Sequence, residues 1–201
     1  MHPSHVLHAA RLCAALLLAG CSPLRSGGAA ASVSADTVVH GEGLILGAEE
    51  GERRVRRPRP GGTAGLTAPF ILKVDERNGG SPDLVMGYED IPPGERIQPH
   101  QHLHADEIIF VHRGSGVATL GGREGAISAG STVYIPRNTR VSLRNTGSEP
   151  LGIAFIFSKP GFEQLMRENS VPEGQPATPV SAEEFARIRA RHRWHTVYDQ
   201  P

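Results

Sequence analysis

The 201-residue sequence contains only two cysteines, Cys13 and Cys21, and both lie near its N-terminus. A domain built from the rest of the chain therefore has no disulfide and no cysteine-ligated metal. Aromatic residues make up only 5% of the chain, and 21 basic residues balance 21 acidic ones. This charge balance argues against a nucleic-acid-binding protein. The sequence also lacks a Gly-rich phosphate-binding loop and a Ser–His–Asp order typical of hydrolases.

An apolar run, "LCAALLLAG", occupies residues 12–20 and is far shorter than the roughly 20 residues that a membrane-spanning helix needs. One Arg and no acidic residue precede it, which is typical of a signal peptide over residues 1–20. The run ends in "LAGC", which resembles the lipobox of bacterial lipoproteins. The resemblance implies acylation of Cys21 and, with Ser22 next, a periplasm-facing position on the outer membrane of the cell envelope. A plain secretory signal with a chance cysteine is the alternative.

Two segments with unusual composition follow this leader. Residues 21–40 are rich in Ser, Ala and Gly, and we expect a flexible tether there. The stretch Arg53–Arg59 holds five arginines in seven positions. It could contact anionic lipid or polysaccharide, or it could be a solvated loop or an edge strand. Pro58 and Pro60 exclude a central strand at that point.

From residue 69 to residue 157, short apolar or alternating runs are separated by Gly, Pro and Asn. The spacing predicts about eight to ten strands and no long helix, which indicates an all-β sandwich or barrel. After residue 158 the pattern changes, and two short helices are expected on the outside of the β domain. The second opens with Ser181 and has Glu184 three positions later, the spacing of a capping box.

The stretch "PHQHLHADE", residues 99–107, places histidines at alternate positions. If residues 97–104 form a strand, His100, His102 and His104 point to the same face. Glu107 opens the next apolar run and can approach from a neighbouring strand. Two imidazoles and one carboxylate form a facial set that binds a divalent metal and leaves coordination positions open.

The spacing of these residues resembles the first conserved motif of the cupin family. Gly94, His100, His102, Glu107 and Gly114 stand at every defining position of that motif. The match includes both histidines, the glutamate and both glycines, and so it is specific.

The second cupin motif is present over residues 130–145 in a degraded form. Gly130, Pro136 and Asn145 stand where the family has them. Asn138 replaces a usual glycine, which is a mild change because Asn tolerates left-handed backbone. Val141 replaces the histidine that is the family's fourth metal ligand, and valine cannot bind a metal.

The resemblance implies a small cupin (jelly-roll) β-barrel over residues 41–160, with its core at 70–160, and a short C-terminal helical extension over residues 161–201. It also implies one divalent transition metal of unspecified identity as cofactor. The implied ligands are His100, His102 and Glu107, and His104 is a candidate for an extra ligand. The alternative is a decayed site in which the two histidines hydrogen-bond to each other or to water.

Two functions agree with these residues. One is a metal-dependent cupin enzyme, a dioxygenase or isomerase acting on a small organic molecule. The other is a non-catalytic cupin that binds a small ligand and has lost its metal through Val141. The expected partners are a small-molecule ligand and, through the N-terminal lipid, the membrane; nucleic acid is not expected, and a homodimer is left open.

Further residues carry less specific expectations. Asp106 is expected to be solvated, and His112 is expected at the surface. Three residues are expected to pack with the last helix or, alternatively, to line a pocket mouth: His192, Trp194 and His195. Two tyrosines lie on expected strands, as substrate contacts or as core: Tyr88 and Tyr134.

Overall fold

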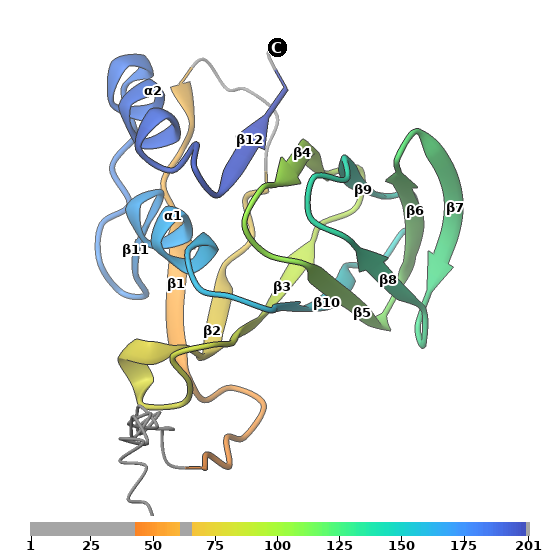
Figure 1. Cartoon of the computed structure of the whole chain (residues 1–201), viewed down its shortest axis with the longest axis horizontal. Helices are drawn as coiled ribbons and strands as arrows, with labels where there is room; N and C mark the ends of the chain where they lie inside the picture. The colour runs from red at the N-terminus through yellow and green to blue at the C-terminus, as the bar shows by residue number, and fades with distance from the viewer. Residues whose placement is uncertain (1–42, 61–65, 200–201) are drawn as a thin grey trace, which may run out of the picture. The chain divides into compact units, whose positions relative to one another are not determined.

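A computed structural model describes residues 43–60 and 66–199 of the chain (Figure 1). The expected signal peptide, Cys21 and the tether lie outside the described residues. No helix within the described part is long and apolar enough to cross a membrane.

The described strands form two antiparallel sheets (Figure 1). The seven-stranded sheet has the order β11-β1-β2-β3-β10-β5-β8, and the five-stranded sheet has the order β12-β4-β9-β6-β7. The strands of the first sheet are β1 (Glu52–Arg56), β2 (Phe70–Val74), β3 (Val85–Ile91), β5 (Glu107–Arg113), β8 (Thr132–Ile135), β10 (Leu151–Phe157) and β11 (Ser170–Pro172). Those of the second are β4 (Arg96–His102), β6 (Ser115–Leu120), β7 (Arg123–Ser128), β9 (Val141–Asn145) and β12 (Thr196–Tyr198).

The all-β prediction is confirmed. Nine strands, β2 to β10, fall between residues 70 and 157, and a 3-10 turn at Glu76–Asn78 is the helical element described there. Burial alternates along β5, where Ile109 and Val111 face the interior while Ile108 and Phe110 are exposed. This period of two sends one face of each sheet into a shared core.

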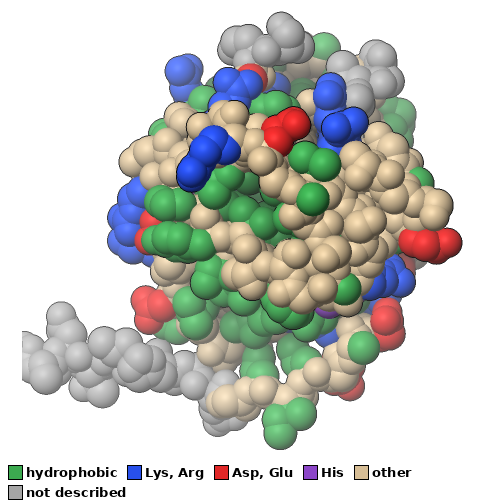
Figure 2. All heavy atoms as spheres, turned by 90° about the vertical axis from the view of Figure 1, so that its right-hand side faces the viewer, with side chains coloured by type: hydrophobic (Ala, Val, Ile, Leu, Met, Phe, Trp, Pro, Cys, Tyr) green, Lys and Arg blue, Asp and Glu red, His purple; other side chains and the backbone are tan. Residues whose placement is uncertain are grey.

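The side of the molecule that carries β6, β7 and β8 has hydrophobic side chains near its centre and charged side chains around them (Figure 2). These side chains are on the surface, whereas apolar area that is buried in the interior stabilises a domain by about 25 cal/mol for each Å² removed from water. Leu143, Leu151 and Ile153 are at most 1% exposed and belong to the main core cluster. The core therefore lies between the inner faces of the two sheets.

The glycines and the asparagine at the turns of the two motifs adopt the positive φ angles that these residue types tolerate. Gly94, Gly114 and Gly130 have φ values of 80°, 74° and 90°. Asn138, with φ 63°, is the one non-glycine residue with positive φ among the described residues. The expectation that Asn138 tolerates the left-handed backbone of the usual glycine is therefore confirmed.

The C-terminal segment contains the two expected helices, α1 (Phe162–Glu168) and α2 (Ala182–Arg191). Ser181 caps α2 by accepting a hydrogen bond of 3.1 Å from the backbone N–H of Glu184. The segment is more than a helical cover, because it also adds β11 to one sheet and β12 to the other. Strands of three residues show too little alternation to be recognised in a sequence.

The expectation of a solvated loop or edge strand at Arg53–Arg59 is wrong for residues 53–56, which lie within β1, whereas residues 57–59 have no regular secondary structure. β1 lies between β11 and β2 and pairs with both, and the two prolines follow its last residue. Acidic residues distant in sequence neutralise much of the cluster. Glu173 pairs with Arg53, and Glu184 pairs with Arg57.

Candidate metal centre

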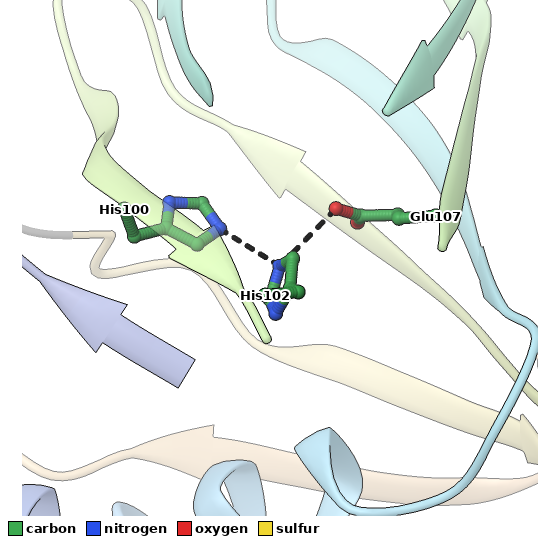
Figure 3. A group of neighbouring side chains, drawn as sticks. All are labelled: His100, His102 and Glu107. Atoms are coloured by element: carbon green, nitrogen blue, oxygen red, sulfur yellow. Dashed lines mark hydrogen bonds and ion pairs between the residues drawn. The ribbon is translucent and has the colours of Figure 1, made fainter. Parts of the chain in front are cut away.

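The two sheets bring His100, His102 and Glu107 together (Figure 3). Both histidines come from β4, and Glu107 is the first residue of β5 in the opposite sheet. The pairing of β4 with β9 shifts between Ile97, opposite Leu143, and His100, opposite Val141. This bulge inserts one residue, so that Ile97 and His100 both face the interior.

The donor atoms of the three side chains have the spacing of a cation site. The Nε2 atoms of His100 and His102 are 3.0 Å apart, and Nε2 of His102 lies 3.3 Å from Oε2 of Glu107. All three ligand atoms lie within 4.8 Å of one another. A cation with ligand bonds of about 2.0–2.2 Å can bridge donors at the two shorter distances.

Hydrogen bonds on the far side of each imidazole fix its orientation. Nδ1 of His100 donates to the carbonyl oxygen of Gln98 at 2.7 Å, which leaves Nε2 with a free lone pair. Nδ1 of His102 lies 3.1 Å from Oγ1 of Thr196, which can accept a hydrogen bond from Nδ1–H and so leave Nε2 with a free lone pair. Both Nε2 atoms are therefore presented to the centre of the group, the arrangement that outer hydrogen bonds give to metal-bound histidines.

Burial controls the protonation of the group, since the three residues are at most 5% exposed. Burial lowers the pKa of His100 to about 4, and it lowers the pKa of His102 to about 3. Burial raises the pKa of Glu107 to about 7. The imidazoles are therefore neutral at physiological pH, which is the form that binds metals.

One atom of the group lacks the partner that its burial demands. Oε2 of Glu107 is buried and accepts no well-formed hydrogen bond from the described residues, although His102 lies nearby. A buried carboxylate oxygen without a donor is unfavourable unless a cation or proton compensates for it. The three side chains thus fit a divalent metal by donor type, spacing and unsatisfied charge.

Val141 occupies the position where a fourth ligand is expected in this family. It is 1% exposed and stands directly opposite His100 in the pairing of β4 with β9. Directly opposed residues of an antiparallel pair lie on the same face. The side of His100 that faces β9 is therefore apolar.

His104 is not brought to the ligand group. β4 ends at His102, two residues before the end expected from the sequence, and His104 is exposed. Its ring lies 5.2 Å from that of Trp194. The expectation that His104 shares the strand face of the other two histidines is wrong.

The remaining expected residues lie outside the ligand group. Asp106 is not part of the ligand group, and its partly exposed side chain pairs with Arg137 at the surface. His112 is exposed, as expected, and Tyr134 points outward with 56% exposure. Tyr88 is half-buried, with its ring 5.6 Å from that of His112.

The C-terminal residues have different positions. His192 is buried and its Nε2 lies 3.0 Å from Glu168, while Trp194 is 50% exposed. His195 is 1% exposed and packs against His102, with ring centroids 5.4 Å apart. Burial lowers the pKa of His195 to about 3, so it is also neutral.

Two residues beside the ligand group were not expected from the sequence. β12 pairs with β4 so that Thr196 stands opposite His102 and Tyr198 opposite His100. The ring of Tyr198 stacks on that of His100 with centroids 5.3 Å apart. Both residues follow the second motif by about fifty positions, and neither belongs to a local pattern that would indicate this role.

Comparison with known proteins identifies the barrel. Residues 87–157 match the family Cupin_2, described as a cupin domain. A predicted oxalate decarboxylase from Thermotoga maritima has a similar fold, with a TM-score of 0.50 and 19% sequence identity; the match covers 58% of this chain and 100% of that one. At this identity the similarity concerns the fold alone.

Two curated proteins are similar in sequence. The polyketide synthase CurC of Streptomyces cyaneus is 30% identical over 107 residues, which cover 51% of this chain and 70% of that protein. The dimethylsulfoniopropionate lyase DddW of Ruegeria pomeroyi is 32% identical over 83 residues, 41% of this chain and 53% of that protein. This chain spans about half the length of several curated relatives that it matches. The matched domain, the two-sheet fold and the similarity to CurC show that this chain belongs to the cupin family.

Proposed function

We propose that His100, His102 and Glu107 bind one divalent transition metal, and that the protein uses this site to transform a small organic molecule. The observation that carries the proposal is the buried, unsatisfied Oε2 of Glu107 beside two neutral imidazoles. A bound metal would supply Lewis acidity and coordination positions that the three protein ligands leave open.

The surroundings of the site favour chemistry away from bulk water. Phe157 and Phe162 pack edge-on against His102, with ring centroids at 4.8 and 5.1 Å. Val141 adds an apolar wall beside His100. An apolar shell of this kind controls solvent access to a metal site. The reaction types we propose are oxygen-dependent cleavage, as in a dioxygenase, and isomerisation.

Elemental analysis of untagged protein tests metal binding directly. We expect close to one equivalent of Fe, Mn, Ni, Cu or Zn for each chain after metal supplementation and desalting. The His100→Ala variant, purified in parallel, is the matched comparison and should retain much less. Protein that holds no metal after supplementation would contradict the proposal.

A second function has its own supporting observation. With its proton on Nε2, His102 can donate a hydrogen bond to Nε2 of His100 at 3.0 Å, and Val141 supplies no ligand. A non-catalytic cupin that binds a small organic ligand in its barrel would have this arrangement. Metal-free protein that binds a small molecule as tightly as supplemented protein would favour this second function.

We further propose that the protein is exported and anchored to the outer membrane through a lipid on Cys21. The support is the sequence "LAGC" at the end of an apolar leader. Mass spectrometry of the N-terminal peptide should find acyl chains on Cys21, and Cys21→Ala should leave precursor or soluble protein. An unacylated N-terminal peptide in the wild type would refute the anchor. The homodimer stays a prediction, which light scattering on the purified protein tests.

A further inference from the structure

A pocket with a volume of about 620 Å³ lies beside the metal ligand group, where β1, β4 and β12 meet the two helices. Apolar side chains form much of its lining: Phe70, Phe162, Leu165, Met166 and Phe185. Tyr198 is part of the same lining and stacks on His100. The ring of Tyr198 therefore borders both the pocket and the metal ligand group. Its volume is within the range of about 300–1,000 Å³ that is typical of small-molecule sites.

Five arginines line this pocket: Arg56, Arg57, Arg59, Arg96 and Arg189. Arg96 is exposed at the start of β4, and two of the others have acidic partners. Arg56 pairs with Glu89, which also lines the pocket. Arg57 pairs with Glu184 through two hydrogen bonds, at 2.6 and 3.2 Å. These two arginines are neutralised within the protein.

Arg59 and Arg189 differ, because neither forms an ion pair with a carboxylate of residues 43–60 and 66–199. Their contacts are with aromatic rings instead. The guanidinium carbon of Arg59 lies 5.5 Å from the ring centroid of Phe185. That of Arg189 lies 5.4 Å from the ring centroid of Phe185 and 4.5 Å from that of Tyr198. The two guanidinium groups thus stand by the same phenyl ring at the pocket.

Arg59 and Arg189 carry charge without an ion-pair partner among the described residues. The carboxylates that line the pocket, Glu89 and Asp199, pair with Arg56 and Arg140 instead. Burial has the largest influence and lowers the pKa of Arg59 and of Arg189. Tyr198 opposes this and raises the pKa of both, while the positive charges of Arg56 and Arg189 lower that of Arg59. Partly buried charges that repel each other and lack a counter-charge are unfavourable, and a bound anion would relieve this cost. A planar guanidinium group also matches the geometry of a carboxylate through two parallel hydrogen bonds.

We infer that Arg59 and Arg189 bind the carboxylate of a small organic acid whose apolar body lies against the aromatic wall of this pocket, next to the metal ligand group. The apolar lining favours a carboxylate with a hydrocarbon body over a small, fully hydrated anion. Arg59, Arg189 and Tyr198 all lie outside residues 87–157, the part that matches the cupin family. The ligand preference therefore comes from segments that this chain adds to the barrel.

The inference names a substrate class for the proposed metal site, and it rests on that proposed function only for the chemistry that follows binding. Binding itself is measurable without metal. Calorimetry on the chelator-treated protein should detect phenylacetate and hexanoate, and should detect phenylacetamide, the neutral counterpart of phenylacetate, much more weakly. If neither carboxylate binds at about 10 mM, the inference is overturned, because a dissociation constant above about 10 mM is weaker than that of a typical ligand site.

Variants identify the groups that bind the carboxylate. Arg189→Gln and Arg59→Gln should each weaken phenylacetate binding about tenfold or more, since each removes a charge-assisted hydrogen-bonding group. The matched control is Arg187→Gln, on the exposed side of the same helix, where Arg187 pairs with Glu183; it should bind phenylacetate as the wild type does. Thermal melts report folding, and if Arg189→Gln is unfolded, Arg59→Gln and Arg189→Lys carry the test.

The outcomes separate this inference from the proposed metal function. Arg189→Gln should bind metal like the wild type, and metal-free His100→Ala should still bind phenylacetate. Phenylacetate binding that needs His100 and metal but neither arginine would overturn the inference and leave the metal function standing. Phenylacetate binding by a protein that takes up no metal would support the inference and refute the metal function. Tighter binding of inorganic phosphate than of either carboxylate would overturn the assignment to a carboxylate.

Discussion

The hydroxyl group of Thr196 holds the outer side of His102, and its loss should weaken metal binding. Oγ1 of Thr196 lies 3.1 Å from Nδ1 of His102, in a residue that is 3% exposed. Thr196→Val keeps the shape of the side chain but leaves that Nδ1 without a partner. Removal of such an outer hydrogen bond costs about 10- to 100-fold in metal affinity. This range corresponds to about 1.4–2.8 kcal/mol.

Calorimetric titration of the metal into wild type, Thr196→Val and Thr196→Ser measures this effect. Thr196→Ser keeps the hydroxyl group and should bind within a few-fold of the wild type. Oγ1 of Thr196 also lies 2.7 Å from Nδ1 of His195, so Thr196→Val should lower stability by about 1–2 kcal/mol as well. Urea unfolding of the metal-free proteins separates this loss from the change in affinity. A Thr196→Val variant that folds and binds metal as tightly as the wild type would refute the reasoning.

Two further predictions concern protons and buried charge. Burial raises the pKa of Glu107 to about 7 in the metal-free protein, so below that pH a proton must leave the carboxyl group before the metal binds. The affinity for the metal should therefore fall by up to about tenfold for each pH unit below 7 and be constant above pH 7. Calorimetry across pH 5–9 checks this, and a fall centred near pH 4.5 would show that burial does not control Glu107. Arg167→Met should lower the free energy of unfolding by about 2–3 kcal/mol, because it removes the ion-pair partner of Asp75, whose carboxylate is in a residue only 1% exposed. The loss should not be larger, since the backbone N–H groups of Arg77 and Asn78 still donate to that carboxylate. Urea unfolding measures this with Arg77→Met, an exposed arginine, as control, and equal losses in both variants would contradict it.

Much of the barrel could be predicted because its signals are local. Alternating apolar residues and turn glycines define strands within a few positions of each other, and the motif spacing indicated which side chains meet. His100, His102 and Glu107 lie within eight positions, so a strand, a turn and the next strand suffice to place them. The prediction for His104 is wrong because β4 ends at His102, and the ends of strands are the least reliable part of such a prediction.

The rest depends on contacts between distant parts of the chain. Thr196 reaches His102 across 94 positions, through a strand of only three residues. Arg57 pairs with Glu184, which is 127 positions away in the sequence. The basic cluster that the sequence predicts to be solvated is therefore partly neutralised in the fold. Such pairings are decided by how sheets and helices pack, and they leave no periodic pattern in either segment.

Metal titration of wild type, His100→Ala and His104→Ala tests the central claim most directly. The two variants remove imidazoles four positions apart, one buried in the ligand group and one exposed outside it. The account predicts binding of one divalent metal by the wild type and by His104→Ala with similar affinity, and a loss of about tenfold or more in His100→Ala. Equal affinity of the wild type and His100→Ala, or a large loss in His104→Ala alone, would contradict it.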